Sequence, residues 1–450
     1  MADCLRIKEK ITKMKKILCF ILVTLLTLSA IGCNGSGNNN QTEEGKTVVV
    51  VYEADKASYW NDIKQEYETK FAAEGYKINL IPVGGGQVEG KQNTMISQGN
   101  APDLILGGDV HILNQYKNLM PLNELIAQDA AEVDYEDFIP EITEKLEYND
   151  NIYYLPEFFN VSVLYYNKDI FDSYNANPAN TDVEYPQSDW TYEDFYAVAD
   201  KLTVRSGNSI SQFGCYSTIG WWGEWLIHVR QAGGNFMNDE GYVTLDTEEA
   251  IEGIQRYYDK MYGANRISNQ KGIDDTFGDF STGTFAMLYG GHINEWSELS
   301  NTALNWDVQL LPTVNGNRNG GELSISAYGI YKNSKSVKAT WELLKLITRK
   351  RSLEEWNDYP YPPCRISGKE LVLGVEKSQR KFPQNLEVVY ESLEEGYCES
   401  LPSVKYFSYV NTSIVQEYIT KILEGQYSVK EGLQLATQNA NNYIRSNYKS

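Results

Sequence analysis

The apolar and polar positions near the N-terminus form a pattern of their own. Residues 17–30 are almost all apolar and follow a basic stretch at residues 13–16, which is the order of a secretory signal. The run is shorter than the roughly 20 residues that a helix needs to cross a membrane, so a signal peptide is favoured over a permanent span. Met14 resembles a natural start, which would make residues 1–13 an upstream extension or the result of a misplaced start codon; the choice between Met1 and Met14 stays open.

Beyond residue 45, short apolar runs alternate with longer amphipathic stretches. Apolar runs without polar alternation are typical of strands that are buried on both faces of a parallel sheet, and they occur at residues 46–52, 77–83 and 103–106. Helical stretches separate them, at 59–74 and up to residue 98. This order predicts an open parallel α/β sheet. Further helices are expected around residues 191–202, 248–262, 339–349 and 413–424.

Length and charge narrow the class of protein. Removal of residues 1–32 as a signal peptide leaves about 418 of the 450 residues, which is enough for two domains. The formal net charge of −21 repels phosphate backbones, so nucleic acid is not an expected partner. The three histidines show no metal-ligand spacing, and neither a metal site nor a cofactor is expected.

A cysteine ends the apolar N-terminal run. Cys33 follows small residues and precedes a polar stretch, which resembles a bacterial lipobox. The resemblance implies cleavage before Cys33 and a diacylglycerol anchor on its thiol, although Ala30 stands where Leu is usual. Residues 33–45 would then be the lipidated cysteine and a flexible linker. An ordinary unpaired cysteine is the alternative, and a disulfide among Cys215, Cys364 and Cys398 stays open.

The glycine-rich segment at residues 85–91 matches the spacing of a phosphate-binding loop. Gln92 replaces the Ser or Thr that would ligate magnesium, and Glu89 would repel a phosphate. We interpret the segment as a turn before a helix.

Several segments in order resemble the extracellular solute-binding proteins of the family that includes maltose-binding protein. They include a small residue followed by Pro-Asp and an apolar strand, a Tyr-Asn-Lys segment and a Gly-Thr-Phe-Ala-Met segment. The matching segments are residues 97–106, 154–156, 164–171, 190–195, 233–234, 283–287, 306–312 and 323–330.

The resemblance implies an α/β, two-lobed periplasmic-binding-protein-like fold with a hinge and an interlobe ligand cleft. The implied lobes are residues 46–157 with 305–345, and residues 158–304 with 346–450. The resemblance also implies a monomeric substrate-binding protein at the extracellular face of the cell membrane, which binds a sugar or oligosaccharide and delivers it to the permease of an ABC transporter. Catalysis is not expected.

Sugars are bound by aromatic faces and a few fixed polar groups in a concave site, and the chain has 33 tyrosines and nine tryptophans. The candidate ligand-binding residues come from loops and from matches to the family's ligand positions. They are Trp60, Asp109, Asn160, Trp222, His292, Trp296, Tyr328 and Arg365.

Each candidate in the first half of the chain has a competing interpretation. Trp60 follows the first strand, where ligands bind in open α/β sheets, but it would also serve as a hydrophobic staple. Asp109 matches a family position and would equally be a surface or cap residue. Asn160 stands where maltose-binding protein has an acid, and Glu157 is a nearby acid that would substitute or form a hinge salt bridge. Trp222 is favoured within a cluster of three tryptophans, one of them expected in the core.

The candidates in the second half are less specific. His292 and Trp296 fall in a family ligand loop, although a lone histidine is more often structural. Tyr328 is expected to follow a strand at residues 323–326. Arg365 would bind an acidic sugar or pair with a surface carboxylate.

Two other classes of protein are compatible with a chain of this kind. A glycoside hydrolase needs two carboxylates that flank the sugar bond, but no distinctive pair and no nucleophile motif is visible. A sensor or adhesion lipoprotein on the same fold stays open. The sequence does not specify the sugar.

Overall fold

A computed structural model describes residues 45–449 apart from 109–114, 208, 293–298, 300–302, 359–360 and 381–382. The predicted signal peptide, Cys33, Asp109 and Trp296 therefore lie outside the described residues. Within them, no helix is both long and apolar enough to cross a membrane.

The first sheet has the predicted parallel order at its centre. Strand β1 (Thr47–Glu53) pairs in parallel with β2 (Lys77–Val83) and β3 (Leu104–Gly107), whereas β12 (Gly321–Ile330) runs antiparallel to β3 and to β6 (Leu155–Val161). The strand order ends with β2 on one side and with β13 (Cys398–Glu399), which pairs with β12, on the other. Tyr328 lies inside β12, because this strand is longer at both ends than the sequence predicted.

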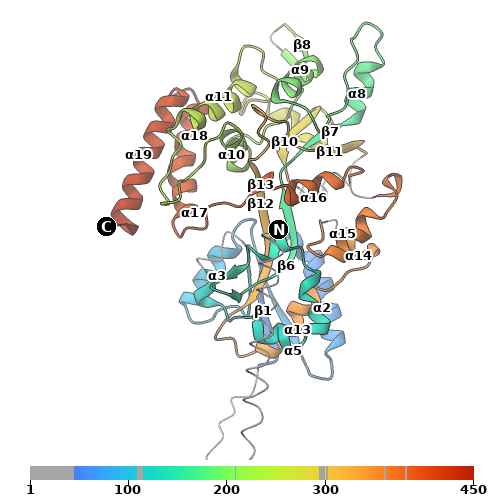
Figure 1. Cartoon of the computed structure of the whole chain (residues 1–450), viewed down its shortest axis with the longest axis vertical. Coiled ribbons are helices and arrows are strands. Elements are labelled where there is room, and N and C mark those ends of the chain that lie inside the picture. The colour runs from blue at the N-terminus through green and yellow to red at the C-terminus, as the bar shows by residue number, and fades with distance from the viewer. Residues whose placement is uncertain are drawn as a thin grey trace, which may run out of the picture. The chain divides into compact units, whose positions relative to one another are not determined.

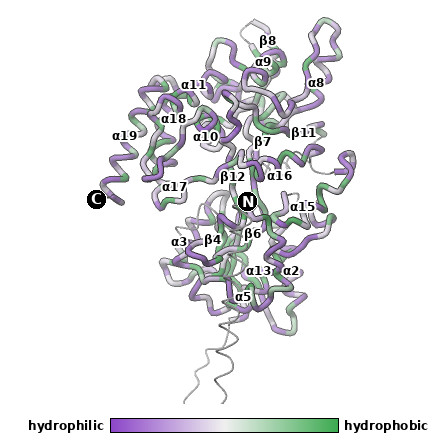
Figure 2. The backbone as a smooth tube through the Cα atoms, in the orientation of Figure 1, coloured by the Kyte–Doolittle hydropathy of each residue, from purple (hydrophilic) through white to green (hydrophobic). Residues whose placement is uncertain are grey.

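The apolar run of β1 is explained by helices on its two faces. Val48 and Val50 pack into the main core with Trp60, Ile63 and Tyr67 of α2 (Ala57–Lys70), whereas Val51 packs with Val88 and Met95 of α3 (Val88–Ser97). Spacings of three and four residues place the α2 side chains on one helix face. Figure 2 shows hydrophobic positions along strands such as β6 and mainly hydrophilic positions along the outer helix α19 (Val429–Tyr448).

The second sheet is antiparallel. Its central strand, β7 (Val163–Asn167), pairs with β10 (Met287–Gly291) and β11 (Trp306–Gln309). Helix α9 (Tyr192–Leu202) begins at a capping box formed by Thr191 and Asp194, which satisfies its first backbone donors. The other elements of this middle region are α8 (Lys168–Asn175), β8 (Val204–Ser206), β9 (Ser209–Gln212), α10 (Trp222–Gln231) and α11 (Glu248–Tyr262).

The helices of the C-terminal part pack in two places. α18 (Gln416–Leu423) and α19 form a core with α10 and α11, and Figure 1 shows these four helices as neighbours. The apolar side chains of α14 (Leu353–Asp358), α15 (Ile366–Leu373) and α16 (Glu387–Glu394) join the main core, which contains side chains of both sheets. The remaining α-helices of the described residues are α5 (Asn123–Gln128), α6 (Ala130–Val133), α7 (Pro140–Thr143), α13 (Val337–Ile347) and α17 (Phe407–Tyr409), and a π-helix spans Val410–Val415.

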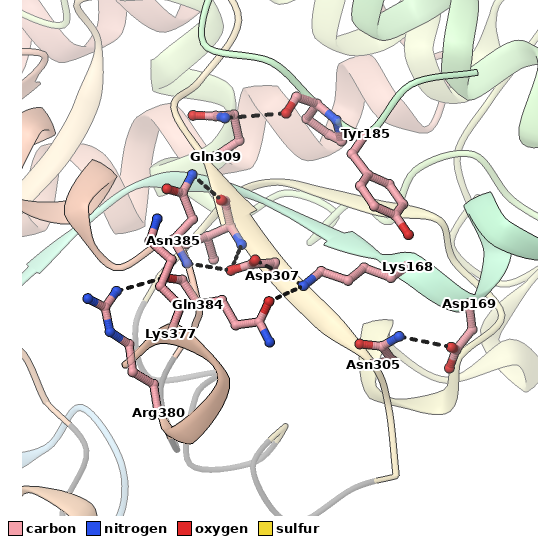
Figure 3. A network of polar contacts seen from close by, with 12 residues as sticks. Lys168, Asp169, Tyr185, Asn305, Asp307, Gln309, Lys377, Arg380, Gln384 and Asn385 are labelled. Carbon is pink, nitrogen blue, oxygen red and sulfur yellow. Dashed lines mark hydrogen bonds and ion pairs between the residues drawn. The ribbon is translucent and has the colours of Figure 1, made fainter. Parts of the chain in front are cut away.

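A polar network fixes the start of α16 to the second sheet (Figure 3). The ammonium of Lys168 lies 3.0 Å from a carboxylate oxygen of Asp307 and 3.1 Å from the side-chain oxygen of Gln384. The backbone N–H of Asn385 donates to the other oxygen of Asp307 at 2.9 Å. Because the next turn of α16 packs against β6, this helix contacts both sheets.

These contacts bear on the predicted lobe boundaries. Strand β11, which the sequence assigns to the first lobe, pairs with β7 of the second. The apolar side chains of helices α14 to α16, assigned to the second lobe, lie in the main core, which contains side chains of both sheets. The boundaries as a whole stay a prediction.

Candidate functional site

A strip of polar side chains runs along β12 and β6. Alternate residues of a strand share one face, and Glu322, Ser324, Ser326 and Tyr328 alternate along β12 with half-buried serines between buried apolar neighbours. Asn160 of β6 stands directly opposite Ser324, so both side chains lie on the same face. We call Glu157, Asn160, Glu322, Ser324, Ser326 and Tyr328 the polar strip.

The backbone beside the strip is tightly packed. A Cβ atom on Gly108, just after β3, would lie 1.9 Å from the carbonyl oxygen of Ile325. Only glycine allows the chain to leave β3 this close to β12.

A β-bulge sets the direction of the Glu157 side chain. The pairing of β6 with β12 shifts after Ser326, which leaves Glu157 as the extra residue of β6, and such bulges redirect side chains. The carboxylate lies 2.6 Å from Arg351 and accepts a hydrogen bond from the hydroxyl of Tyr59. Glu157 thus forms the salt bridge that was one of its two expected roles.

Burial controls the protonation state of Tyr59 in this cluster. The pKa of Tyr59 is raised well above its usual value by desolvation, which outweighs the opposing effect of Arg351. Its hydroxyl therefore stays protonated and donates to Glu157.

The structure places Trp60 inside the core next to this cluster. Its indole is 2% exposed and contacts the rings of Tyr52 and Tyr328, with centroids 6.2 Å and 5.8 Å away. Trp60 therefore supports Tyr328 from behind and has almost no surface for a ligand in this conformation.

An aromatic pair near Glu157 was not found from the sequence. Phe158 and Tyr361 stack with centroids 4.2 Å apart, and the ammonium of Lys56 lies 5.2 Å from the Phe158 ring. Lys56 follows β1 at its carboxyl end, where ligands bind in open α/β sheets. The aromatic pair could not be found from the sequence because Tyr361 is 203 residues away from Phe158 in the chain. The position of Lys56 after the first strand was the only sequence signal of this place.

At the other end of the strip, Glu322 connects to two tryptophans through His292. Nε2 of His292 lies 2.9 Å from the Glu322 carboxylate, and the edge of its ring meets Trp221 with centroids 4.9 Å apart. Trp221 in turn contacts Trp222 at 5.9 Å. Both tryptophans are half-buried, whereas Trp225 is fully buried.

A buried ionic cluster supports the tryptophans. Glu224 of α10 accepts from the backbone N–H of Thr218 at 2.7 Å and pairs with Lys260, with both charged side chains at most 1% exposed. His228 stacks on Tyr289 nearby, and neither ring nitrogen has a hydrogen-bond partner. Desolvation, with smaller contributions from Lys260 and Arg256, holds the pKa of His228 well below 6.5. The imidazole is therefore neutral.

Arg365 is held by protein groups. Its guanidinium donates to the carbonyls of Thr348 and Val133, both at 2.9 Å, and lies 3.3 Å from the carboxylate of Asp137. It also covers the ring of Phe138 at 3.9 Å. Of the two expected roles, pairing with a carboxylate is the one seen in this conformation.

The described residues contain two grooves away from the strip. One, of about 650 Å³, is lined by α9, α11 and Lys430, and the other, of about 560 Å³, lies along α2. No candidate ligand residue lines either groove.

No group of His, Cys, Asp or Glu in the described ranges is arranged to hold a metal ion, and Cys215, Cys364 and Cys398 are free thiols. In the glycine-rich turn, the N–H of Gly86 donates to Glu53 at 2.9 Å.

The strip thus brings Asn160 and Tyr328 together on one surface, with Trp60 behind one end and His292 and Trp222 at the other. Arg365 belongs to a separate cluster. Hydroxyl and amide groups, with carboxylates that are already paired to protein groups, can bind a polar, uncharged ligand such as a sugar when aromatic rings lie beside them.

Two curated relatives match part of the chain. A Halalkalibacterium halodurans protein named arabinooligosaccharide-binding protein is 28% identical over 211 residues, which cover 45% of this chain and 41% of that protein. A Bacillus subtilis protein of the same name is 20% identical over 254 residues, 55% of each chain. The chain spans about half the length of these relatives.

Solved structures share the fold over most of the chain. A Listeria monocytogenes ABC substrate-binding protein in complex with cycloalternan has a TM-score of 0.72 at 20% identity, covering 88% of this chain and 98% of the other. A solute-binding protein from Agrobacterium vitis with bound D-mannitol has a TM-score of 0.71 at 18% identity, covering 89% and 99%. These matches confirm the predicted α/β periplasmic-binding-protein fold.

The model of one protein family matches residues 52–353, more than half of the chain. Its members bind solutes, which confirms the prediction that the chain is not an enzyme. The chain belongs to the family of bacterial extracellular solute-binding proteins.

Proposed function

We propose that the chain binds a sugar or oligosaccharide and delivers it to the permease of an ABC importer. The observation that carries this proposal is the polar strip, which joins hydroxyl and amide groups to tryptophans through His292. Its relatives support the proposal, since two are named for arabino-oligosaccharides. Binding is followed by closure of two lobes around the ligand and by docking on the permease.

For ligand contact we propose Asn160, Trp222, His292 and Tyr328, together with Asp109 and Trp296. Trp60 and Arg365 then act by positioning their neighbours, because protein groups surround both. The half-buried Trp221 joins the contact residues.

A thermal-shift screen tests this function. Residues 45–450 contain all four hydrophobic cores, and this body is screened against neutral and acidic sugars, arabino- and malto-oligosaccharides, amino acids and short peptides. Ligand binding to the native state raises the melting temperature by mass action. We expect a shift with one class of sugar that is recovered uncleaved, and a smaller shift for Trp222→Ala. Tyr258→Ala, which removes a half-buried aromatic ring from α11, is the control. Shifts with peptides alone, or cleavage of the sugar, would overturn the proposal.

We also propose that Cys33 carries a diacylglycerol anchor at the outer face of the cell membrane. The full chain, expressed in bacteria with its leader, should partition into the detergent phase of Triton X-114, whereas Cys33→Ala should move to the aqueous phase. Cys215→Ala removes a buried thiol and should partition like the wild type. Equal partitioning of wild type and Cys33→Ala would contradict the anchor.

A further inference from the structure

A cluster of tyrosines covers the C-terminal end of α19. Among the large hydrophobic side chains that are exposed in the described residues, the aromatic ones are Tyr409 and Tyr448, 49% and 46% exposed. Both belong to this cluster, which the red end of the chain in Figure 1 locates near α17. Exposed aromatic groups gathered in one place commonly mark a binding surface.

The rings form a connected layer. Tyr409 stacks on Tyr443 with centroids 4.6 Å apart, Tyr443 contacts Tyr448 at 6.0 Å, and Tyr448 contacts Tyr406 at 4.9 Å. The hydroxyl of Tyr406 donates to the carbonyl of Gly241 at 2.9 Å. The layer is therefore anchored at its buried end and open at Tyr409 and Tyr448.

Unpaired cations lie beside the rings. The charged groups of Arg445 and Lys449 stand 5.3 Å and 4.6 Å from the ring centre of Tyr242. Neither makes an ion pair within the described part of the chain, and the side-chain partner of Arg445 is the amide of Asn442. The chain as a whole is acidic, with a formal net charge of −21, and many of its other lysines and arginines are paired with carboxylates. Arg445 and Lys449 differ from these paired cations.

The chemistry of this surface selects its ligand. Aromatic faces cover the apolar C–H faces of sugars, and exposed Arg and Lys groups bind carboxylate or phosphate. The aliphatic neighbours Val410 and Ile444 are fully buried, so the surface has little to insert into a lipid bilayer.

We propose that this cluster is a second binding surface, separate from the polar strip, for an anionic polysaccharide whose sugars carry carboxylate or phosphate groups. Its residues are Tyr242, Tyr406, Tyr409, Tyr443, Arg445, Tyr448 and Lys449. The surface shares no residue with the strip, and the inference does not rest on the proposed transport function.

Affinity electrophoresis tests the proposal. Residues 45–450 are run in native gels that contain polygalacturonate or, for comparison, neutral dextran. We expect polygalacturonate to retard the protein and added salt to reduce the retardation. The variants Tyr409→Ala/Tyr448→Ala and Arg445→Gln/Lys449→Gln should each weaken binding at least fivefold, with unchanged melting temperatures. Tyr258→Ala should bind like the wild type.

Three results would overturn the proposal. They are the absence of retardation by polygalacturonate, retardation that both double variants retain, and binding to anionic lipid vesicles without binding to polygalacturonate. A saturating ligand of the polar strip should leave the retardation unchanged, so this test and the thermal-shift screen can fail independently.

Discussion

Removal of the Glu157 carboxylate tests whether the buried ion pair beside the polar strip holds this part of the protein together. The side chains of Glu157 and Arg351 are 2% and 5% exposed. Arg351 also donates to the carbonyl of Ile347 at 3.0 Å. In Glu157→Ala the guanidinium keeps this bond but loses its only carboxylate partner in the described residues.

The expected loss of unfolding free energy in Glu157→Ala follows from the burial of the two charged side chains. A buried charge that loses its partner costs about 3–5 kcal/mol, a large fraction of the roughly 5–15 kcal/mol that stabilises a typical domain. Replacing both members by apolar side chains removes the desolvation cost as well, and such exchanges are often close to neutral. Glu157→Met/Arg351→Met should therefore be more stable than Glu157→Ala by roughly 3 kcal/mol.

Urea unfolding followed by far-UV circular dichroism measures both variants. Glu417→Ala breaks an exposed pair between neighbouring turns of α18 and should leave the unfolding curve unchanged. A loss below about 1 kcal/mol in Glu157→Ala, or a double variant that is no more stable than Glu157→Ala, would refute the reasoning from burial.

Three further expectations concern other parts of the structure. His228 stays neutral when folded but takes up a proton near pH 6.5 when unfolded, so the wild type should lose about 1.4 kcal/mol of stability between pH 7.5 and 5.5 through this residue. His228→Leu should lack that part of the pH dependence, and equal slopes would contradict the assignment. Lys168→Met leaves the Asp307 carboxylate buried without its cation and should cost about 3 kcal/mol in urea unfolding; a change below 1 kcal/mol would show that the network of Figure 3 contributes little. Trp222→Ala should weaken sugar binding roughly 2- to 13-fold in calorimetry, and an unchanged affinity would remove Trp222 from the site.

The strands and helices of the first sheet were predictable because they depend on local pattern. The runs at 46–52 and 77–83 correspond to Thr47–Glu53 and Lys77–Val83, since residues buried on both faces must be continuously apolar. The helix expected at 59–74 ends earlier, at Lys70, and Gly75 follows with a φ of 76°. The stretch around 413–424 contains a π-helix before α18, which no apolar period reveals.

The site was less predictable because its contacts are long-range. The residues joined in the Glu157–Arg351 pair are 194 positions apart, and nothing near Arg351 in the sequence marks it as buried. The tryptophan cluster could be found by composition alone, but the full burial of Trp225 comes from its position on α10, where every residue after Trp222 is buried.

Burial within the strip bears on how a ligand would be recognised. Asn160, His292 and Tyr328 are 6%, 7% and 5% exposed, so in this conformation they present edges only. Ser324, Ser326 and Trp221 are half-buried beside them and offer more surface. Recognition would then divide between two layers, in which the half-buried groups contact the sugar broadly and the buried groups contact it only through their exposed edges and hold the half-buried groups in place. Such preorganisation raises affinity because little side-chain freedom is lost on binding. On this argument, substitutions in the buried layer should reduce stability and affinity together, whereas substitutions in the half-buried layer should reduce affinity alone.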